Sequence, residues 1–292
     1  MGLGGPLTWW SPDLCRLLAE RGFYVVRYDN RDVGRSTKLT TYGGRRGQVV
    51  KSFVSSRTVL PRALAPYTPP YTLSDMASDA VGLLDHLGVD RAHTVGVSMG
   101  GMIGQTVAID HPHRVASLVS IMSTTGRQTV GWQDPRLIPR MLGRGRHSRE
   151  TYMYESVRTW RAIGSPAYPI SVEEARDRAA ETFDRGISPS GVIRQLQAVL
   201  AQPNRSTALR AVTAPTLVIH GLADRLVHVS GGRATARAIP GAELLLIPGM
   251  GHDMPREVWP VLIDGIERTA KRAQSPTSEA TSSSNSSSAS RR

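Results

Sequence analysis

The heptapeptide GVSMGGM, residues 96–102, decides the fold class of this chain. A short apolar run precedes it and a second apolar stretch follows it. This order predicts a strand, a sharp turn and a helix, with Ser98 at the turn. Gly96 and Gly100 would let the strand and the helix approach closely, because glycine has no Cβ. A serine in such a turn projects its hydroxyl above the sheet, where it can react.

The motif alone is weak evidence, because an ordinary glycine-rich loop has the same composition. The surrounding sequence is more informative. Continuously apolar runs recur at Val115–Met122, Pro215–His220 and Glu243–Ile247. Continuous rather than alternating apolar character is typical of strands that are covered on both faces, as in a parallel sheet.

Helical patterns alternate with these strands. The N-terminal part adds a helix capped at Ser11, a strand over Phe23–Tyr28 and a second helix capped at Ser74. Two more helices are predicted at 230–238 and 257–272. The alternation predicts an α/β fold with a mostly parallel sheet and helices on both faces.

The segment 127–205 has no strand signature. An all-helical insertion between two strand-bearing halves predicts a lid over the carboxyl edge of the sheet, where such folds bind small molecules. The core would then comprise residues 1–126 and 206–273, and the Ser-rich segment 274–292 is predicted to be disordered. Three helices are expected in the lid, over 152–160, 172–182 and 191–200.

The composition narrows the class of protein. A length of 292 residues suffices for one large α/β domain with an insertion, and 40% hydrophobic residues suit a globular core. No apolar stretch is long enough to span a membrane, no signal-peptide pattern is present, and a single cysteine, Cys15, excludes an internal disulfide. We therefore expect a cytoplasmic protein. The net charge of +12 comes largely from dispersed arginines without interleaved aromatics, which argues against nucleic-acid binding.

A serine hydroxyl is a poor nucleophile at neutral pH, so it needs a base, and the base needs a group that orients it. Asp224 follows the apolar run that ends at His220, and His252 follows the run 243–247. Both therefore lie beyond strand ends, on the edge of the sheet where Ser98 is expected. Asp253 and Asp264 compete with Asp224 for the role of the acid, but only Asp224 follows a strand directly.

The chain resembles the α/β-hydrolase superfamily, and most closely the branch of anthracycline methylesterases and similar small-ester hydrolases. The order Ser, acid, His matches that fold. The resemblance implies Ser98 as nucleophile, His252 as general base and then acid, and Asp224 as the group that orients the imidazole. It is carried by residues 1–4, 29–36 (DNRDVGRS), 96–101, 215–224 and 248–252 (PGMGH).

An oxyanion intermediate needs two hydrogen-bond donors. The amide of Met99, directly after the serine, supplies one. The resemblance places the second at the Leu3 amide, because the sequence Met1-Gly2-Leu3 occupies the family's oxyanion turn. No ligand cluster or phosphate-binding loop is present, so no metal or cofactor is expected.

The chain departs from the family at its start. Members usually have two or three strands before the oxyanion turn, and the third of these is central in the sheet. We therefore expect that translation begins upstream of Met1 or that the chain is a fragment. A sheet without its central strand would leave backbone groups unpaired.

These observations predict a serine hydrolase that acts on a carboxylic ester of a small, fairly apolar molecule. The serine argues against chemistry that uses an aspartate nucleophile. Two alternatives stay open: cofactor-free perhydrolysis by the same triad, and a non-catalytic binding protein or inactive fragment on this fold.

Overall fold

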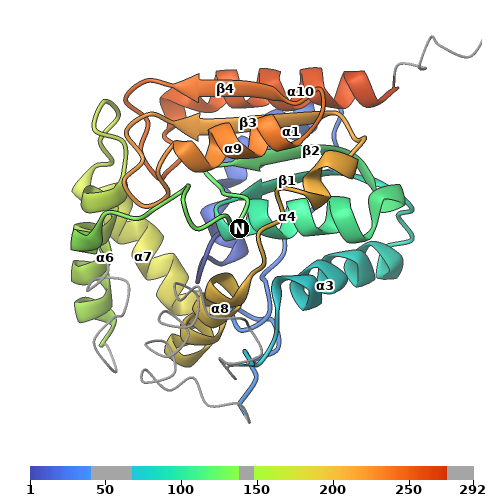
Figure 1. The fold of residues 1–292 in the computed structure, drawn as a ribbon. Helices are drawn as coiled ribbons and strands as arrows, with labels where there is room; N and C mark the ends of the chain where they lie inside the picture. Colours follow the sequence, from blue (N-terminus) through green and yellow to red (C-terminus); the bar gives the residue numbers. More distant parts are fainter. Residues whose placement is uncertain (41–67, 138–147, 275–292) are drawn as a thin grey trace, which may run out of the picture.

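The computed structural model describes residues 1–40, 68–137 and 148–274. Its sheet has four parallel strands in the order β1-β2-β3-β4 (Figure 1). The strands are β1 (Ala92–Val97), β2 (Val115–Ile121), β3 (Thr216–Gly221) and β4 (Glu243–Ile247). The predicted parallel sheet is confirmed.

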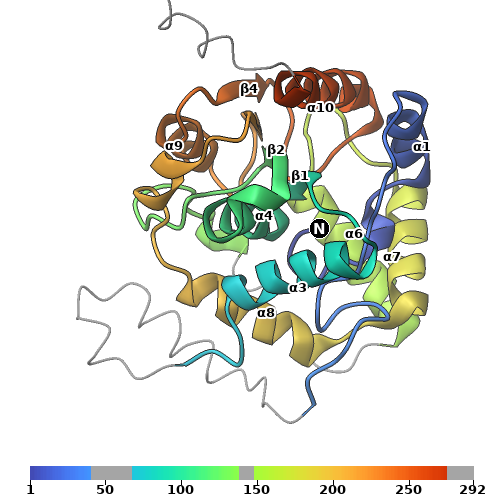
Figure 2. The same ribbon diagram turned by 90° about the vertical axis from the view of Figure 1, so that its right-hand side faces the viewer.

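Helices cover both faces of the sheet. Figure 2 shows α4 and α9 on one side of the strands and α1 and α10 on the other. Successive side chains of β2 point to opposite faces of the sheet: Leu118 packs in the core under α4, and Val119 packs in the core under α10. Both side chains are almost fully buried, which explains why the strand is continuously apolar. The helices are α1 (Pro12–Glu20), α3 (Leu73–His86), α4 (Met99–Asp110), α9 (Ser230–Ala238) and α10 (Trp259–Gln274).

The start of α3 differs from the prediction that Ser74 caps this helix. The Thr72 hydroxyl accepts a hydrogen bond from the Asp75 amide, and the Asp75 carboxylate accepts one from the Thr72 amide. This reciprocal capping box satisfies two free amides at once, so the helix begins at Leu73. The Ser74 hydroxyl instead donates to the Asp110 carboxylate at 3.2 Å.

The predicted strand Phe23–Tyr28 is wrong. The segment is extended but pairs with no described strand, and β1 pairs only with β2. The Phe23 ring meets the His93 ring of β1 edge to face, with ring centroids 5.9 Å apart, so side chains rather than backbone groups make the contact. An apolar run becomes a strand only when a neighbouring strand offers it hydrogen bonds.

Three helices form an insertion between β2 and β3 and lie together below the sheet in the view of Figure 1. Ser148, Ser171 and Ser188 cap them, each accepting a hydrogen bond from the amide three residues later. Residues 138–147, within the predicted lid, lie outside the described residues, and so does the predicted disordered segment, except Gln274, which ends α10. The helices are α6 (Arg149–Ile163), α7 (Val172–Gly186) and α8 (Pro189–Ala201).

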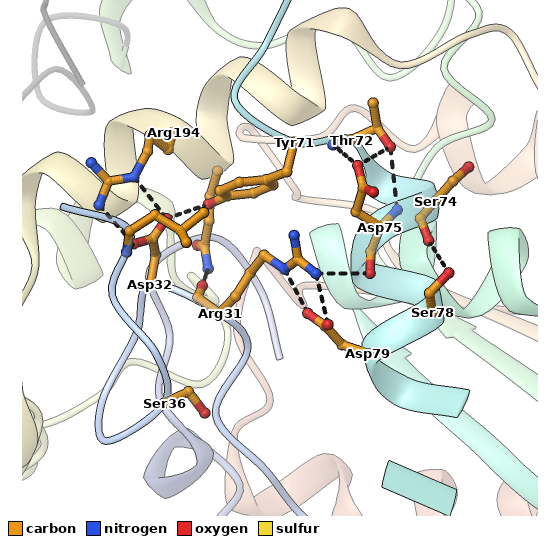
Figure 3. A network of polar contacts seen from close by, with 12 residues as sticks. Arg31, Asp32, Ser36, Tyr71, Thr72, Ser74, Asp75, Ser78, Asp79 and Arg194 are labelled. Atoms are coloured by element: carbon orange, nitrogen blue, oxygen red, sulfur yellow. Dashed lines mark hydrogen bonds and ion pairs between the residues drawn. The ribbon is translucent and has the colours of Figure 1, made fainter. Parts of the chain in front are cut away.

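A buried ion pair joins α8 to the loop that precedes α3 in the chain (Figure 3). Arg194 donates to both carboxylate oxygens of Asp32, at 2.6 and 2.8 Å, and the Tyr71 hydroxyl and the Leu39 amide each donate to the same carboxylate at 2.9 Å. Burial alone would raise the pKa of Asp32, but the Arg194 guanidinium, the Leu39 amide and the Tyr71 hydroxyl lower it below its ordinary value.

Breaking this pair is expected to reduce the free energy of unfolding by about 3–5 kcal/mol, because a buried charge is left without its partner. Asp32→Asn and Arg194→Met each do so. The double variant should lose less unfolding free energy than the two single variants together, since neither buried charge then remains. Urea denaturation measures the effect.

The exposed pair Arg149–Asp184 supplies the control. Arg149→Met should leave the free energy of unfolding almost unchanged, because water solvates both of these charges. If the double variant loses as much unfolding free energy as the two single variants together, the expected coupling between Asp32 and Arg194 is contradicted.

Candidate active site

Ser98 lies at the sharp turn between β1 and α4. Its backbone has φ 56° and ψ −117°, a region that residues other than glycine rarely adopt. A Cβ at Gly96 would overlap the carbonyl oxygen of Gly100, so the glycine allows the strand and helix to approach. The turn is held by hydrogen bonds from the Ser98 amide to the Ile121 carbonyl and from the Ser123 hydroxyl to the Ser98 carbonyl, both 2.8 Å. The predicted strand, turn and helix are thus confirmed.

Asp224 and His252 meet where β3 and β4 end. Nδ1 of His252 lies 2.8 Å from one carboxylate oxygen of Asp224. The other carboxylate oxygen accepts hydrogen bonds from the amides of Leu226 and Val227, at 2.9 and 2.8 Å. Asp224 is 4% exposed and His252 8%. The arrangement orients the imidazole, because a carboxylate fixed by two amides holds Nδ1.

The charge on Asp224 is favoured by its neighbours. Burial alone would raise the pKa of this carboxyl, but the imidazoles of His252 and His220 outweigh burial and hold that pKa well below its usual range. The carboxylate therefore stays ionised and accepts the proton of Nδ1.

The two competing carboxyl groups lie elsewhere. Asp253 accepts a hydrogen bond from the Ser165 hydroxyl, and burial raises its pKa. Asp264 pairs with Arg21 at the surface, at 3.1 Å. The sequence criterion, a position directly after a strand, therefore selects the carboxylate that contacts His252.

His220 contacts the acid as well, which its sequence position alone did not predict. Its Nε2 lies 2.8 Å from the Val227 carbonyl and 3.4 Å from the Asp224 carboxylate, and the ring is fully buried. Nε2 therefore carries the proton that it donates to Val227. Its Nδ1 has no hydrogen-bond partner among the described residues. The four-residue spacing between His220 and Asp224 gives no signal of this contact, because such a spacing joins side chains on a helix and His220 lies near the end of β3.

The N-terminal residues lie beside Ser98. A Cβ at Gly2 would come within 3.3 Å of Cβ of Ser98. Within the described part of the chain, neither the Leu3 amide nor the Met99 amide donates a hydrogen bond. Neither amide is therefore used by another described residue, which is what the expected oxyanion role of the two requires.

The helical insertion holds the loop that carries His252. The His252 amide donates to the Ile163 carbonyl at 2.8 Å, and the Gly251 amide donates to the Ser165 hydroxyl at 2.9 Å. A shift of α6 would therefore move the imidazole.

The structure does not join all the predicted residues by hydrogen bonds. No hydrogen bond links the Ser98 hydroxyl to His252 among the described residues. Such bonds are often long in structures without substrate and shorten when substrate binds. The structure thus brings Asp224 to His252 and the Leu3 segment to Ser98.

The described residues contain no group of three or more His, Cys, Asp or Glu residues placed to hold a metal ion. In the same part of the chain, no helix has both the length and the apolar character needed to cross a membrane.

Known proteins resemble this chain over most of its length. Rhodomycin D methylesterase DnrP of Streptomyces peucetius is 28% identical over 282 residues, which cover 88% of this chain and 84% of the relative. RutD of Caulobacter sp. (strain K31), named as a carbamate hydrolase, is 30% identical over 254 residues, with 86% and 81% covered. The enol-lactonase from Burkholderia xenovorans LB400 shares the fold, with a TM-score of 0.64, 21% identity, and 92% and 88% covered.

The resemblance predicted from the motifs is confirmed by these relatives. The model of the alpha/beta hydrolase fold matches residues 2–255, which include Ser98, Asp224 and His252. This chain therefore belongs to the α/β-hydrolase fold family.

Proposed function

We propose that this protein is a serine hydrolase that cleaves a carboxylic ester of a small apolar molecule, with Ser98, His252 and Asp224 as its triad. One observation carries the proposal: the 2.8 Å contact between His252 and Asp224, at the edge of the sheet where the strained Ser98 turn also lies. The relatives support the reaction class, since their names describe a methylesterase, a carbamate hydrolase and an enol-lactonase.

The first half of the reaction forms an acyl-enzyme. Oγ of Ser98 attacks the ester carbonyl carbon while Nε2 of His252 takes its proton. The amides of Met99 and Leu3 donate hydrogen bonds to the oxyanion that forms. The imidazolium then gives its proton to the leaving alkoxide as the ester C–O bond breaks.

The second half repeats these steps with water. His252 takes a proton from a water molecule, whose oxygen attacks the acyl carbon, and the imidazolium returns the proton to Oγ of Ser98 as the acid leaves. Asp224 stabilises the imidazolium in both halves and keeps the neutral ring in the tautomer whose Nε2 accepts the proton.

The insertion, residues 127–205, would act as the lid that selects the substrate. Its described helices follow β2, and the end of α6 and the residue Ser165 after it bond to the His252 loop. Trp160 of α6 packs against Trp9 with ring centroids 5.0 Å apart, so the insertion also contacts the N-terminal segment.

A fluorophosphonate probe tests the proposal. The probe reacts with a serine only when a base activates that serine, so we expect one covalent modification per chain, at Ser98. Intact mass and peptide mass spectrometry measure its number and place. Protein denatured in urea before labelling is the control and should not react. A folded sample that stays unmodified would contradict the proposed function.

A further inference from the structure

We propose that Gln195 of α8 is a positioning residue, which holds the N-terminal turn so that the Leu3 amide can stabilise the oxyanion. This inference rests on the proposed function. It links the insertion to the second oxyanion donor, whereas the proposed triad residues all follow strands of the sheet.

Gln195 bridges two loops of the core with the two ends of its amide group. Oε1 accepts a hydrogen bond from the Gly4 amide at 2.8 Å, and Nε2 donates one to the Arg31 carbonyl at 2.8 Å. The residue is fully buried. Water therefore cannot replace either bond, and losing the side chain would leave a buried amide and a buried carbonyl unpaired.

The bond to Gly4 acts next to the Leu3 amide. The Gly5 amide donates to the Gly2 carbonyl at 3.0 Å, so Leu3 and Gly4 are the central residues of a tight turn. Gly4 has φ +67°, the sign that a type II turn requires at this position. A Cβ there would lie 2.9 Å from the Val192 side chain, one helical turn before Gln195. The helix α8 thus packs directly on the turn.

Gln195 stands on a rigid part of the helix. The adjacent Arg194 makes the buried pair with Asp32 (Figure 3). Asp32 lies next to Arg31, whose carbonyl Gln195 binds. Side chain and helix are therefore fixed to the same loop. A group held at both ends in this way can define the position of a third segment to a fraction of an ångström.

The insertion also holds the far end of the N-terminal segment. The Asp29 carboxylate accepts a hydrogen bond from the Leu7 amide at 2.7 Å, and Arg185 of α7 pairs with this carboxylate at 2.8 Å. The turn at residues 2–5 is thus held between Gly2, which lies against Ser98, and two contacts that depend on α7 and α8.

Gln195→Met tests the inference, because methionine fills a similar volume but makes neither hydrogen bond. We expect kcat for a p-nitrophenyl ester to fall by about 10- to 100-fold with KM changed less than about 3-fold, since the Leu3 amide acts on the transition state. A boronic acid, whose tetrahedral adduct places an oxygen at the oxyanion position, should bind more weakly by a similar factor. Gln197→Met is the matched control, on the same helix and equally buried, and should keep kcat within about 3-fold.

Gln195→Glu separates positioning from packing. Burial favours the protonated acid, which accepts from Gly4 and donates to Arg31 as the amide does, so this variant should keep kcat within a few-fold. If Gln195 only fills space, both variants should stay active, because methionine and protonated glutamate each fill a volume close to that of glutamine. Retained kcat and boronate affinity in folded Gln195→Met would overturn the inference. A wild-type protein that neither hydrolyses esters nor reacts with the fluorophosphonate would instead overturn the proposed function.

Discussion

Replacing Ser98 with alanine is expected to lower kcat/KM for ester hydrolysis by about 10⁴- to 10⁶-fold while the protein stays folded. In the proposed mechanism Oγ of Ser98 forms the acyl-enzyme, so its removal should stop both halves of the reaction. The backbone at φ 56° is strained for serine and alanine alike, so stability should change little. Hydrolysis of a p-nitrophenyl ester, with thermal melting followed by circular dichroism, measures both effects.

Ser78 offers the control for this variant. It lies on α3, where its hydroxyl donates to the Ser74 carbonyl at 3.0 Å, away from the carboxyl edge of the sheet. Ser78→Ala should hydrolyse the ester at the wild-type rate. Ester turnover that persists in purified Ser98→Ala would exclude Ser98 as the nucleophile.

Replacing Asp224 with asparagine should lower kcat by about 10³- to 10⁴-fold. The asparagine oxygen can still accept from the amides of Leu226 and Val227, so the loop keeps its shape. Its NH₂ group then faces Nδ1 of His252 and favours the tautomer that carries its proton on Nε2. That tautomer cannot take the proton of Ser98, and the positive charge on the imidazolium is no longer stabilised.

Asp264→Asn is the matched control for this charge change. Asp264 also follows the sheet in the sequence, but its carboxylate pairs with Arg21 at the surface. We expect kcat within about 2-fold of wild type. Comparable losses in the two variants would mean that net charge, not contact with His252, explains the effect, and unchanged kcat in Asp224→Asn would remove it from the triad.

The sequence was sufficient where structure is local. Continuous apolar runs predicted β2, β3 and β4 nearly to the residue, because a strand buried on both faces can tolerate little else. The glycines around Ser98 predicted its turn, because a Cβ there would overlap the neighbouring backbone. Asp224 was chosen over two other acids by its place after a strand, since the carboxyl ends of parallel strands share one edge.

The sequence was insufficient where a residue depends on a distant partner. Phe23–Tyr28 has the composition of a strand but finds no neighbour to pair with. Thr72 rather than the predicted Ser74 caps α3, because Thr72 can form reciprocal hydrogen bonds with Asp75. Gln195 gave no signal, since a glutamine in a helix is ordinary until its contacts are known.

The sequence by itself thus determined the α/β fold, the Ser98 turn and the positions of Asp224 and His252 after their strands, because periodicity and glycine placement act over a few residues. Only the tertiary structure decided how His252 meets Asp224, through Nδ1 at 2.8 Å from a carboxylate oxygen, and that α8 reaches the N-terminal turn through Gln195. The two residues of the first contact are 28 positions apart in the sequence, and those of the second are 191 positions apart. Hydrogen bonds at such separations depend on how whole helices and strands pack.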